Sequence, residues 1–118
     1  MKSYESRIIE PVEIVTTFGP ETEFEGELEF ETSLRILGKF KGGIKTNGLL
    51  IIGEDATVEA DITAGSVIIG GLVKGNVEAK SKLEILSTGK IYGNVKTNKL
   101  RIADGVIFEG TCQMLKSD

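Results

Sequence analysis

The sequence contains no histidine and no tryptophan, and it has only one cysteine and two prolines. The absence of histidine removes the most common general base and the most common transition-metal ligand, so catalysis and metal binding are both disfavoured. The single cysteine, Cys112, excludes an intrachain disulfide and fits a reducing compartment. No apolar run is long enough to span a bilayer and the N-terminus shows no signal-peptide pattern, so we expect a soluble, cytoplasmic protein.

An excess of basic charge is also missing. The 118 residues include 14 Lys and Arg against 18 Asp and Glu, which gives a formal net charge of −4. A nucleic-acid-binding protein needs a basic stripe that neutralises phosphates, so no nucleic acid partner is expected. The length is that of a single domain.

The sequence lacks the short motifs of common enzyme and ion sites as well. Its glycine-rich stretches, residues 38–43 and 65–71, lack the Gly-Lys-Ser/Thr ending of a phosphate-binding loop. The acidic residues between positions 54 and 61 lack the spacing and the central glycine of a calcium loop. We therefore expect no enzyme activity, no cofactor and no bound metal.

What the chain does contain is one short pattern repeated six times, in which apolar, small and apolar residues are separated by single residues. The copies are Phe24-x-Gly26-x-Leu28, Phe40-x-Gly42-x-Ile44, Val58-x-Ala60-x-Ile62, Val73-x-Gly75-x-Val77, Ile91-x-Gly93-x-Val95 and Phe108-x-Gly110-x-Cys112. A second series lies between them and comprises Leu34-x-Ile36, Leu50-x-Ile52, Val67-x-Ile69, Leu83-x-Ile85 and Leu100-x-Ile102. The small residues are 16, 18, 15, 18 and 17 positions apart. Two strand signals at a nearly constant period indicate a solenoid.

The repeat predicts an all-β, single-domain, right-handed parallel β-helix, a triangular solenoid of about six rungs, each rung being one full circuit of the coil. Side chains alternate along a strand, so the apolar residues of each copy share the inward face, with the small residue expected at a crowded inner corner. Turn-forming residues between the strands fit three short faces per rung. The uneven spacing favours the right-handed type, because left-handed β-helices usually keep a strict hexapeptide repeat. No segment has helical periodicity.

Two classes of β-helical enzyme share stacked aliphatic residues with this chain. Left-handed β-helix acyltransferases generally rely on a histidine base, which is absent here. Right-handed β-helix lyases and hydrolases are much longer and carry catalytic loops, whereas the segments between the strand signals of this chain are short. Neither class therefore fits the sequence.

The outward positions of the first four copies alternate in charge. Glu25, Lys41, Glu59 and Lys74 occupy equivalent positions, and they become lateral neighbours when the strands stack. This alternation avoids like-charge contacts, and such pairs contribute roughly 0.2–1 kcal/mol each. The charge pattern therefore supports stacking in this register.

The ordered set of repeats resembles the bactofilin family of bacterial cytoskeletal proteins. The resemblance is carried by EFEGELEFETSLRILGKFKGGI (23–44), LIIGEDATVEADITAGSVIIGGLVKGNV (50–77), LEILSTGKIYGNV (83–95) and LRIADGVIFEGTCQM (100–114). It implies a right-handed β-helix that assembles with itself, end to end and without nucleotide, into filaments that lack polarity. It also implies a scaffold in cell shape, cell-wall synthesis or protein localisation, with a cell-wall enzyme or a membrane-associated protein as further partner.

We expect three segments: an N-terminal extension (1–17) that is partly flexible or covers the rod, a β-helix domain (18–114) and a short C-terminal tail (115–118). Family members often carry longer, proline-rich tails, so this tail argues against partner recruitment through it. Direct membrane binding through residues 1–17 is disfavoured, because glutamates outnumber the two basic residues there. Any association with the inner face of the cell membrane would use this segment.

The two ends of a β-helix expose unpaired backbone groups and a section of the apolar core, which template further pairing unless they are capped. The candidate polymer-interface residues at the C-terminal end are Ile102, Phe108, Cys112 and Met114. The corresponding residues at the N-terminal end are Phe18, Phe24 and Leu28, where the preceding residues could fold over the opening. Phe108 is the leading anchor because it is the largest of the first group. The alternative is that it fills the core of the last rung.

A second candidate surface lies on the side of the rod. Ile51 and Ile68 should point outward on adjacent rungs, where the equivalent positions elsewhere are Arg35, Glu84 and Arg101. An exposed apolar pair marks a contact site. Residues 8–18 could cover it, or it could serve lateral bundling or a partner. Two functions remain open: a self-polymerising scaffold, and a non-polymerising β-helical module that docks a cell-wall enzyme or membrane partner.

Overall fold

The computed structural model describes residues 16–19, 21, 23–31 and 33–114, and within these ranges the protein is built from strands without any helix. Thirteen strands are present in this part of the chain. In chain order they are β1 (Thr16–Phe18), β2 (Glu23–Phe30), β3 (Leu34–Ile36), β4 (Lys39–Thr46), β5 (Leu49–Ile52), β6 (Thr57–Ile69), β7 (Leu72–Lys74), β8 (Val77–Ile85), β9 (Lys90–Tyr92), β10 (Val95–Thr97), β11 (Leu100–Ile102), β12 (Ile107–Glu109) and β13 (Cys112–Met114).

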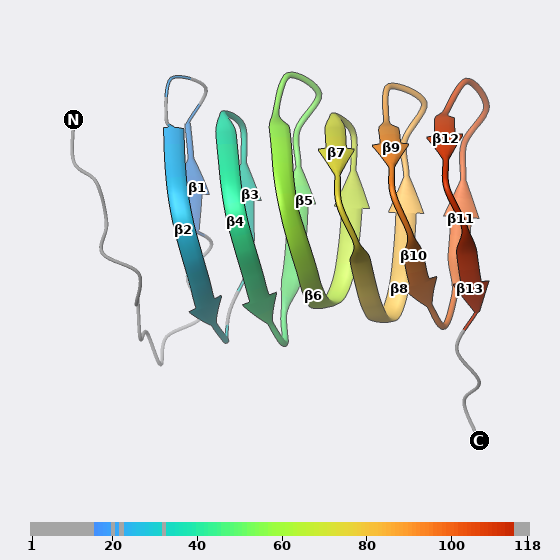
Figure 1. Ribbon diagram of the computed structural model, residues 1–118, viewed down its shortest axis with the longest axis horizontal. Coiled ribbons are helices and arrows are strands. Elements are labelled where there is room, and N and C mark those ends of the chain that lie inside the picture. Colours follow the sequence, from blue (N-terminus) through green and yellow to red (C-terminus); the bar gives the residue numbers. More distant parts are fainter. Residues whose placement is uncertain (1–15, 20, 22, 32, 115–118) are drawn as a thin grey trace.

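The strands stack in parallel register on three faces of one continuous coil (Figure 1). The first face consists of β1, β3, β5, the C-terminal parts of β6 and β8, and β11. The second consists of the N-terminal parts of β2, β4 and β6, followed by β7, β9 and β12. The third consists of the C-terminal parts of β2 and β4, the middle of β6, the start of β8, β10 and β13.

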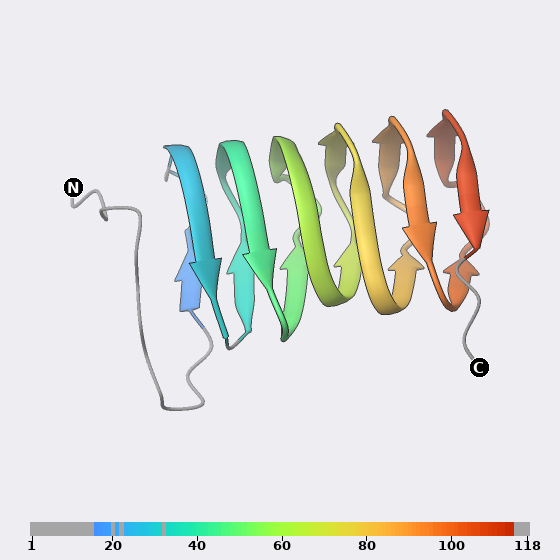
Figure 2. The same ribbon diagram turned by 60° about the horizontal axis from the view of Figure 1, so that its bottom comes forward.

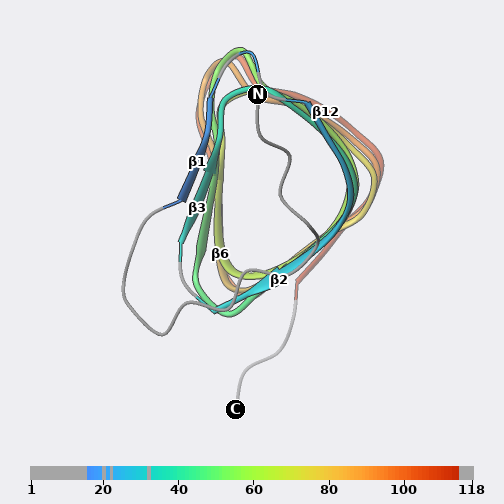
Figure 3. The same ribbon diagram turned by 90° about the vertical axis from the view of Figure 1, so that its left-hand side faces the viewer.

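The coil crosses each face six times in the described residues, so five full steps separate the first and last strands of a face. Seen along the rod, the rungs superpose as a rounded triangle (Figure 3). As the coil advances from the N-terminal to the C-terminal end, the nearer strands run downward and the more distant ones run upward (Figures 1 and 2). This is a right-handed coil, which confirms the predicted solenoid and its hand.

The core fills the inside of the coil with stacked apolar columns. In β3, Leu34 and Ile36 are buried while Arg35 between them is exposed. The register repeats this alternation from rung to rung, so each buried side chain packs on similar ones in the neighbouring rungs. Full burial of such a side chain contributes about 1.5–3 kcal/mol. The largest fully buried side chains are Phe40, Leu34, Ile36, Leu50, Ile52, Ile62, Ile69, Leu83, Ile85, Ile91, Val58 and Val67.

The outward charges follow the register that the sequence predicts. Glu25 lies beside Lys41, Lys41 beside Glu59, and Glu59 beside Lys74 on the second face. The next position in this column is the uncharged Tyr92. Opposite charges therefore alternate along four rungs, and this register places no like charges in contact there.

The glycines of four copies, Gly42, Gly75, Gly93 and Gly110, are crowded in a different direction from the one expected. Gly42 is exposed, with a φ of 131°, at the corner between the second and third faces. A Cβ placed on Gly42 would collide with the carbonyl oxygen of Gly26 in the preceding rung. The expected crowded inner corner is therefore wrong for the glycines, because the missing side chain would point along the rod. Ala60 differs, since it is buried within the continuous strand β6.

Replacing Gly42 by alanine should destabilise the protein, because it combines an unfavourable φ with a backbone collision. We expect the free energy of unfolding to fall by about 2 kcal/mol or more. Gly43→Ala is the matched control, because a Cβ there lies no closer than 3.6 Å to any neighbour. Thermal melting followed by circular dichroism, at one protein concentration, measures both variants. Equal melting temperatures for the two would contradict the axial-stacking explanation.

Candidate functional site

The two ends of the coil carry strands with a neighbour on one side only. Within the described residues, β11, β12 and β13 pair with β8, β9 and β10 respectively and with nothing beyond. At the other end, β1 and β2 pair only with β3 and β4. Each of these strands leaves backbone N–H and C=O groups without a strand partner, and such edges accept another strand.

The C-terminal end exposes a section of the hydrophobic core. The register places Ile102 on Ile85 and Cys112 on Val95, so both stand in inward columns. Their partners Ile85 and Val95 are at most 1% exposed, whereas Ile102 is 48% exposed. The side chain of Cys112 is exposed, because no further rung of the described chain covers it. Met114, at the end of β13, is also exposed.

Phe108 differs from its neighbours at this end because part of its ring is already packed. It stands on Ile91 in the inward column of the second face. The ring is half-buried against the core, and the remainder faces the open end of the coil. Phe108 therefore contributes to the core of the last rung and keeps part of its surface exposed.

The N-terminal end is more closed within the described residues. Phe24 is half-buried and stacks on Phe40, with ring centroids 5.0 Å apart. Leu28 is buried, with 3% of its surface exposed. The backbone of Phe18 belongs to β1, but its side chain lies outside the description. The expected cover formed by residues 1–17 falls almost entirely on residues outside the described part of the chain.

The side-chain column on the first face places the two outward isoleucines together. Ile51 lies beside Ile68, and both are half-buried. Arg35 precedes them in the column and Glu84 follows, as the repeat predicts. The sequence reasoning missed Leu86, which is 39% exposed on the same face. The signal was present, because Leu86 directly follows one of the aliphatic pairs.

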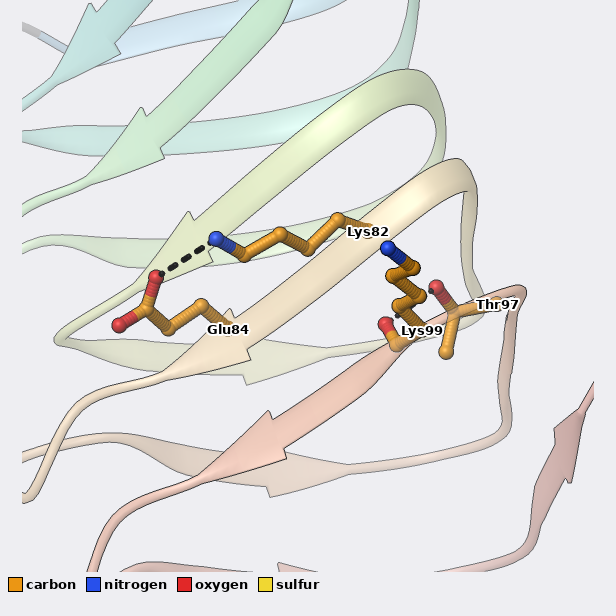
Figure 4. A network of polar contacts seen from close by, with 4 residues as sticks. All are labelled: Lys82, Glu84, Thr97 and Lys99. Carbon is orange, nitrogen blue, oxygen red and sulfur yellow. Dashed lines mark hydrogen bonds and ion pairs between the residues drawn. The ribbon is translucent and has the colours of Figure 1, made fainter.

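Polar groups at the corner between the third and first faces are satisfied locally. Lys82 and Glu84 form an ion pair, with 3.6 Å between Nζ and Oε1, at the rod surface (Figure 4). The hydroxyl of the buried Thr97 donates a hydrogen bond of 3.0 Å to the carbonyl oxygen of Lys99. No described side chain has a buried polar atom without a hydrogen-bond partner. These polar contacts therefore stabilise the fold, and the residues that form them provide no candidate reactive group.

Two further observations limit the chemistry of the described residues. They contain no group of three or more histidine, cysteine, aspartate or glutamate side chains that could hold a metal ion. No helix in this part of the chain has the length and the apolar character needed to cross a membrane. The apolar ends and the first face are thus the surfaces that suit association.

Known proteins match the chain along almost the whole coil. A family model described as Bactofilin, polymer-forming cytoskeletal, matches residues 16–113. Bactofilins BacO and BacP of Myxococcus xanthus (strain DK1622) are 34% and 27% identical over 99 residues, which is 84% of this chain. The matched region spans 79% of BacO and 41% of BacP.

A solved structure has the same fold. It is a cryo-EM reconstruction of Thermus thermophilus bactofilin double helical filaments, with a TM-score of 0.80 and 31% sequence identity. The likeness covers 85% of this chain and 99% of that one. Since both the sequence match and the fold extend over the coil, this chain belongs to the bactofilin family, whose members are polymer-forming cytoskeletal proteins and not enzymes.

Proposed function

We propose that this protein is a cytoskeletal scaffold whose rods join through their ends into filaments. The observation that carries the proposal is the open C-terminal end, where Ile102, Phe108 and Met114 present core surface beside the free edges of β11 to β13. Joining two such ends removes apolar surface from water and supplies partners for the edge groups. The related Thermus protein, which was solved as filaments, supports the same function.

The proposed filaments lack polarity, because like ends meet. The C-terminal end is broad and apolar, whereas the described N-terminal residues are more closed, so the ends differ in character. A contact between two identical ends is isologous, so a filament needs one such contact at the C-terminal ends and a second at the N-terminal ends. Phe18, Phe24 and Leu28 are the proposed residues of the second contact, which is the weaker of the two because that end is more closed. Burial of apolar surface and edge pairing supply the driving force, so assembly needs no nucleotide or metal. The chain also lacks a phosphate-binding loop.

The proposed cellular role is support of cell shape, cell-wall synthesis or protein localisation from the cytoplasm. A rod with repeated side faces offers many equivalent positions to a cell-wall enzyme or a membrane-associated protein, which suits a scaffold. Residues 1–17 are the proposed extension, 18–114 the polymerising domain and 115–118 the tail. Attachment to the inner face of the membrane would use the extension.

Phe108→Arg should abolish filaments while leaving the fold intact, because a charged side chain at the junction opposes burial of the joined ends. We expect a soluble monomer with the wild-type β-sheet signal in circular dichroism. Ile107→Arg is the control, because Ile107 lies on the same strand and is 42% exposed on the outward side. Negative-stain electron microscopy in nucleotide-free buffer with chelator compares both with wild type.

Two results would argue against the proposal. Filaments of the Phe108→Arg variant would show that this ring is not at the junction. Small discrete wild-type particles would instead favour the non-polymerising module that binds a partner.

The thiol of Cys112 offers an independent test, because it is exposed at the C-terminal end and is the only cysteine in the chain. Assembly through this end should slow its reaction with a thiol reagent at least several-fold relative to the Phe108→Arg monomer. Absorbance of the released reagent group measures the rate. Equal rates in filament and monomer would place the junction elsewhere.

A further inference from the structure

Four consecutive outward positions on the first face hold two isoleucines between an arginine and a glutamate. Arg35 lies beside Ile51, Ile51 beside Ile68, and Ile68 beside Glu84, on four consecutive rungs. At about 4.8 Å per strand, the two charges lie three spacings apart, about 14 Å. The midpoint of the column falls between Ile51 and Ile68.

The residues of the next column on the same face are arranged symmetrically about the same midpoint. Leu37, Gly53, Gly70 and Leu86 follow the strands, and hydrogen bonds link equivalent positions: Gly53 N to Ile36 O, 2.9 Å, Gly70 N to Ile52 O, 2.7 Å, and Leu86 N to Ile69 O, 2.8 Å. Each leucine leans over the neighbouring glycine. A Cβ on Gly53 would meet Leu37 Cδ2 at 2.5 Å, and one on Gly70 would meet Leu86 Cδ1 at 3.5 Å.

We propose that two rods pair side by side and antiparallel through the first face, about a two-fold axis that runs along the strands midway between Ile51 and Ile68. Such an axis reverses the order of the rungs and keeps each column opposite itself. Arg35 of one rod then faces Glu84 of the other, and Glu84 of the first rod faces Arg35 of the second. Ile51 faces Ile68. This inference rests on the proposed function, since the rods are those of the filament.

The column of Leu37, Gly53, Gly70 and Leu86 adds apolar contacts under the same two-fold rotation. Leu37 of one rod faces Leu86 of the other, and Gly53 faces Gly70. The leucines meet as apolar pairs, and the two glycines between them carry no side chain that would hold the facing rods apart. Both columns are thus complementary to themselves in one and the same arrangement, as an isologous interface requires.

The charges exclude the other simple arrangement. A two-fold axis along the rod would pair the rods in parallel and set each rung against the same rung of its partner. Arg35 would then face Arg35 and Glu84 would face Glu84, so both contacts would be repulsive. Only the antiparallel arrangement turns both into attractive pairs.

The remaining charges of the face tolerate this arrangement. Lys82 pairs with Glu84 Oε1 within its own rod, at 3.6 Å, which leaves the second carboxylate oxygen for the guanidinium of the facing rod (Figure 4). Arg35 is exposed and forms no ion pair within the described part of the chain. One rung further out, Arg101 lies beside Glu84 of its own rod, so it and the facing Arg35 share that carboxylate. Arg101 itself lies opposite the position of Thr17, which carries no charge.

The contact is small for a single pair of rods. Four strands of four residues give a footprint of roughly 250 Å², below the roughly 800 Å² per partner of a stable complex. Pairing should therefore be weak between single subunits and strong between filaments, where the contact repeats along the length and each contact holds the next in place.

Charge exchange tests the inference on the full-length protein. Arg35→Glu and Glu84→Arg each place like charges in contact, so each should convert paired filaments into single ones. The double variant Arg35→Glu/Glu84→Arg restores opposite charges and should restore pairing. Lys96→Glu, the same type of reversal on the third face, is the control and should leave pairing unchanged. Electron microscopy measures filament width, and circular dichroism confirms the fold. Added salt should weaken wild-type pairing.

The outcomes separate this inference from the proposed function. Single wild-type filaments, paired filaments in both single variants, or a double variant that stays unpaired would each overturn the antiparallel pairing and leave the filament function standing. Single wild-type filaments whose width no variant changes would favour residues 8–18 as the cover of this face. Wild-type protein that forms no filaments would overturn the proposed function and the pairing together.

Discussion

Parallel, in-register stacking of the backbone is the constraint on which the rest of this structure depends. Each strand takes its hydrogen-bond partners from the strands one rung before and one rung after, so no rung is complete alone. The adjacent interior rungs that contain Val67 and Leu83 have strand partners on both sides, and these two side chains are fully buried. The last rung is satisfied on one side only. An open end therefore follows from the architecture, and association with another end supplies the edge strands with the partners they lack.

The glycines at the corner between the second and third faces, Gly42, Gly75, Gly93 and Gly110, set how closely the rungs can stack there. Gly42 and Gly93 place backbone directly on the backbone of the preceding rung, where a Cβ has no room. Parallel register, with one shift between Ala64 and Ser66, places equivalent residues of successive rungs beside one another. It aligns Arg35, Ile51 and Ile68 in one row on the first face. The register thus determines which side chains a partner meets along the rod.

Much of this could be predicted from the sequence, because strand alternation and a period near 17 identify the inward columns and their register. The repeat directly predicted the alternation of charge between Glu25 and Lys41 and the lateral pairing of Ile51 with Ile68. The direction of crowding at Gly42 could not be predicted, since apolar periodicity carries no information about φ. Cys112 is exposed although its column points inward, because burial also needs a following rung. The roles of the end and side surfaces depend on a second copy, which one sequence does not describe.

The central claim is that rods join through their C-terminal ends, where the open strand edges and exposed core of two subunits meet. A cryo-EM reconstruction of the wild-type filament tests it most directly, because it resolves which strands meet at each junction. The account predicts that the edge formed by β11, β12 and β13 of one subunit meets the same edge of the next, with the apolar core continuous through Phe108. A filament whose subunits touch only through their side faces, with these three strands open to solvent, would contradict it.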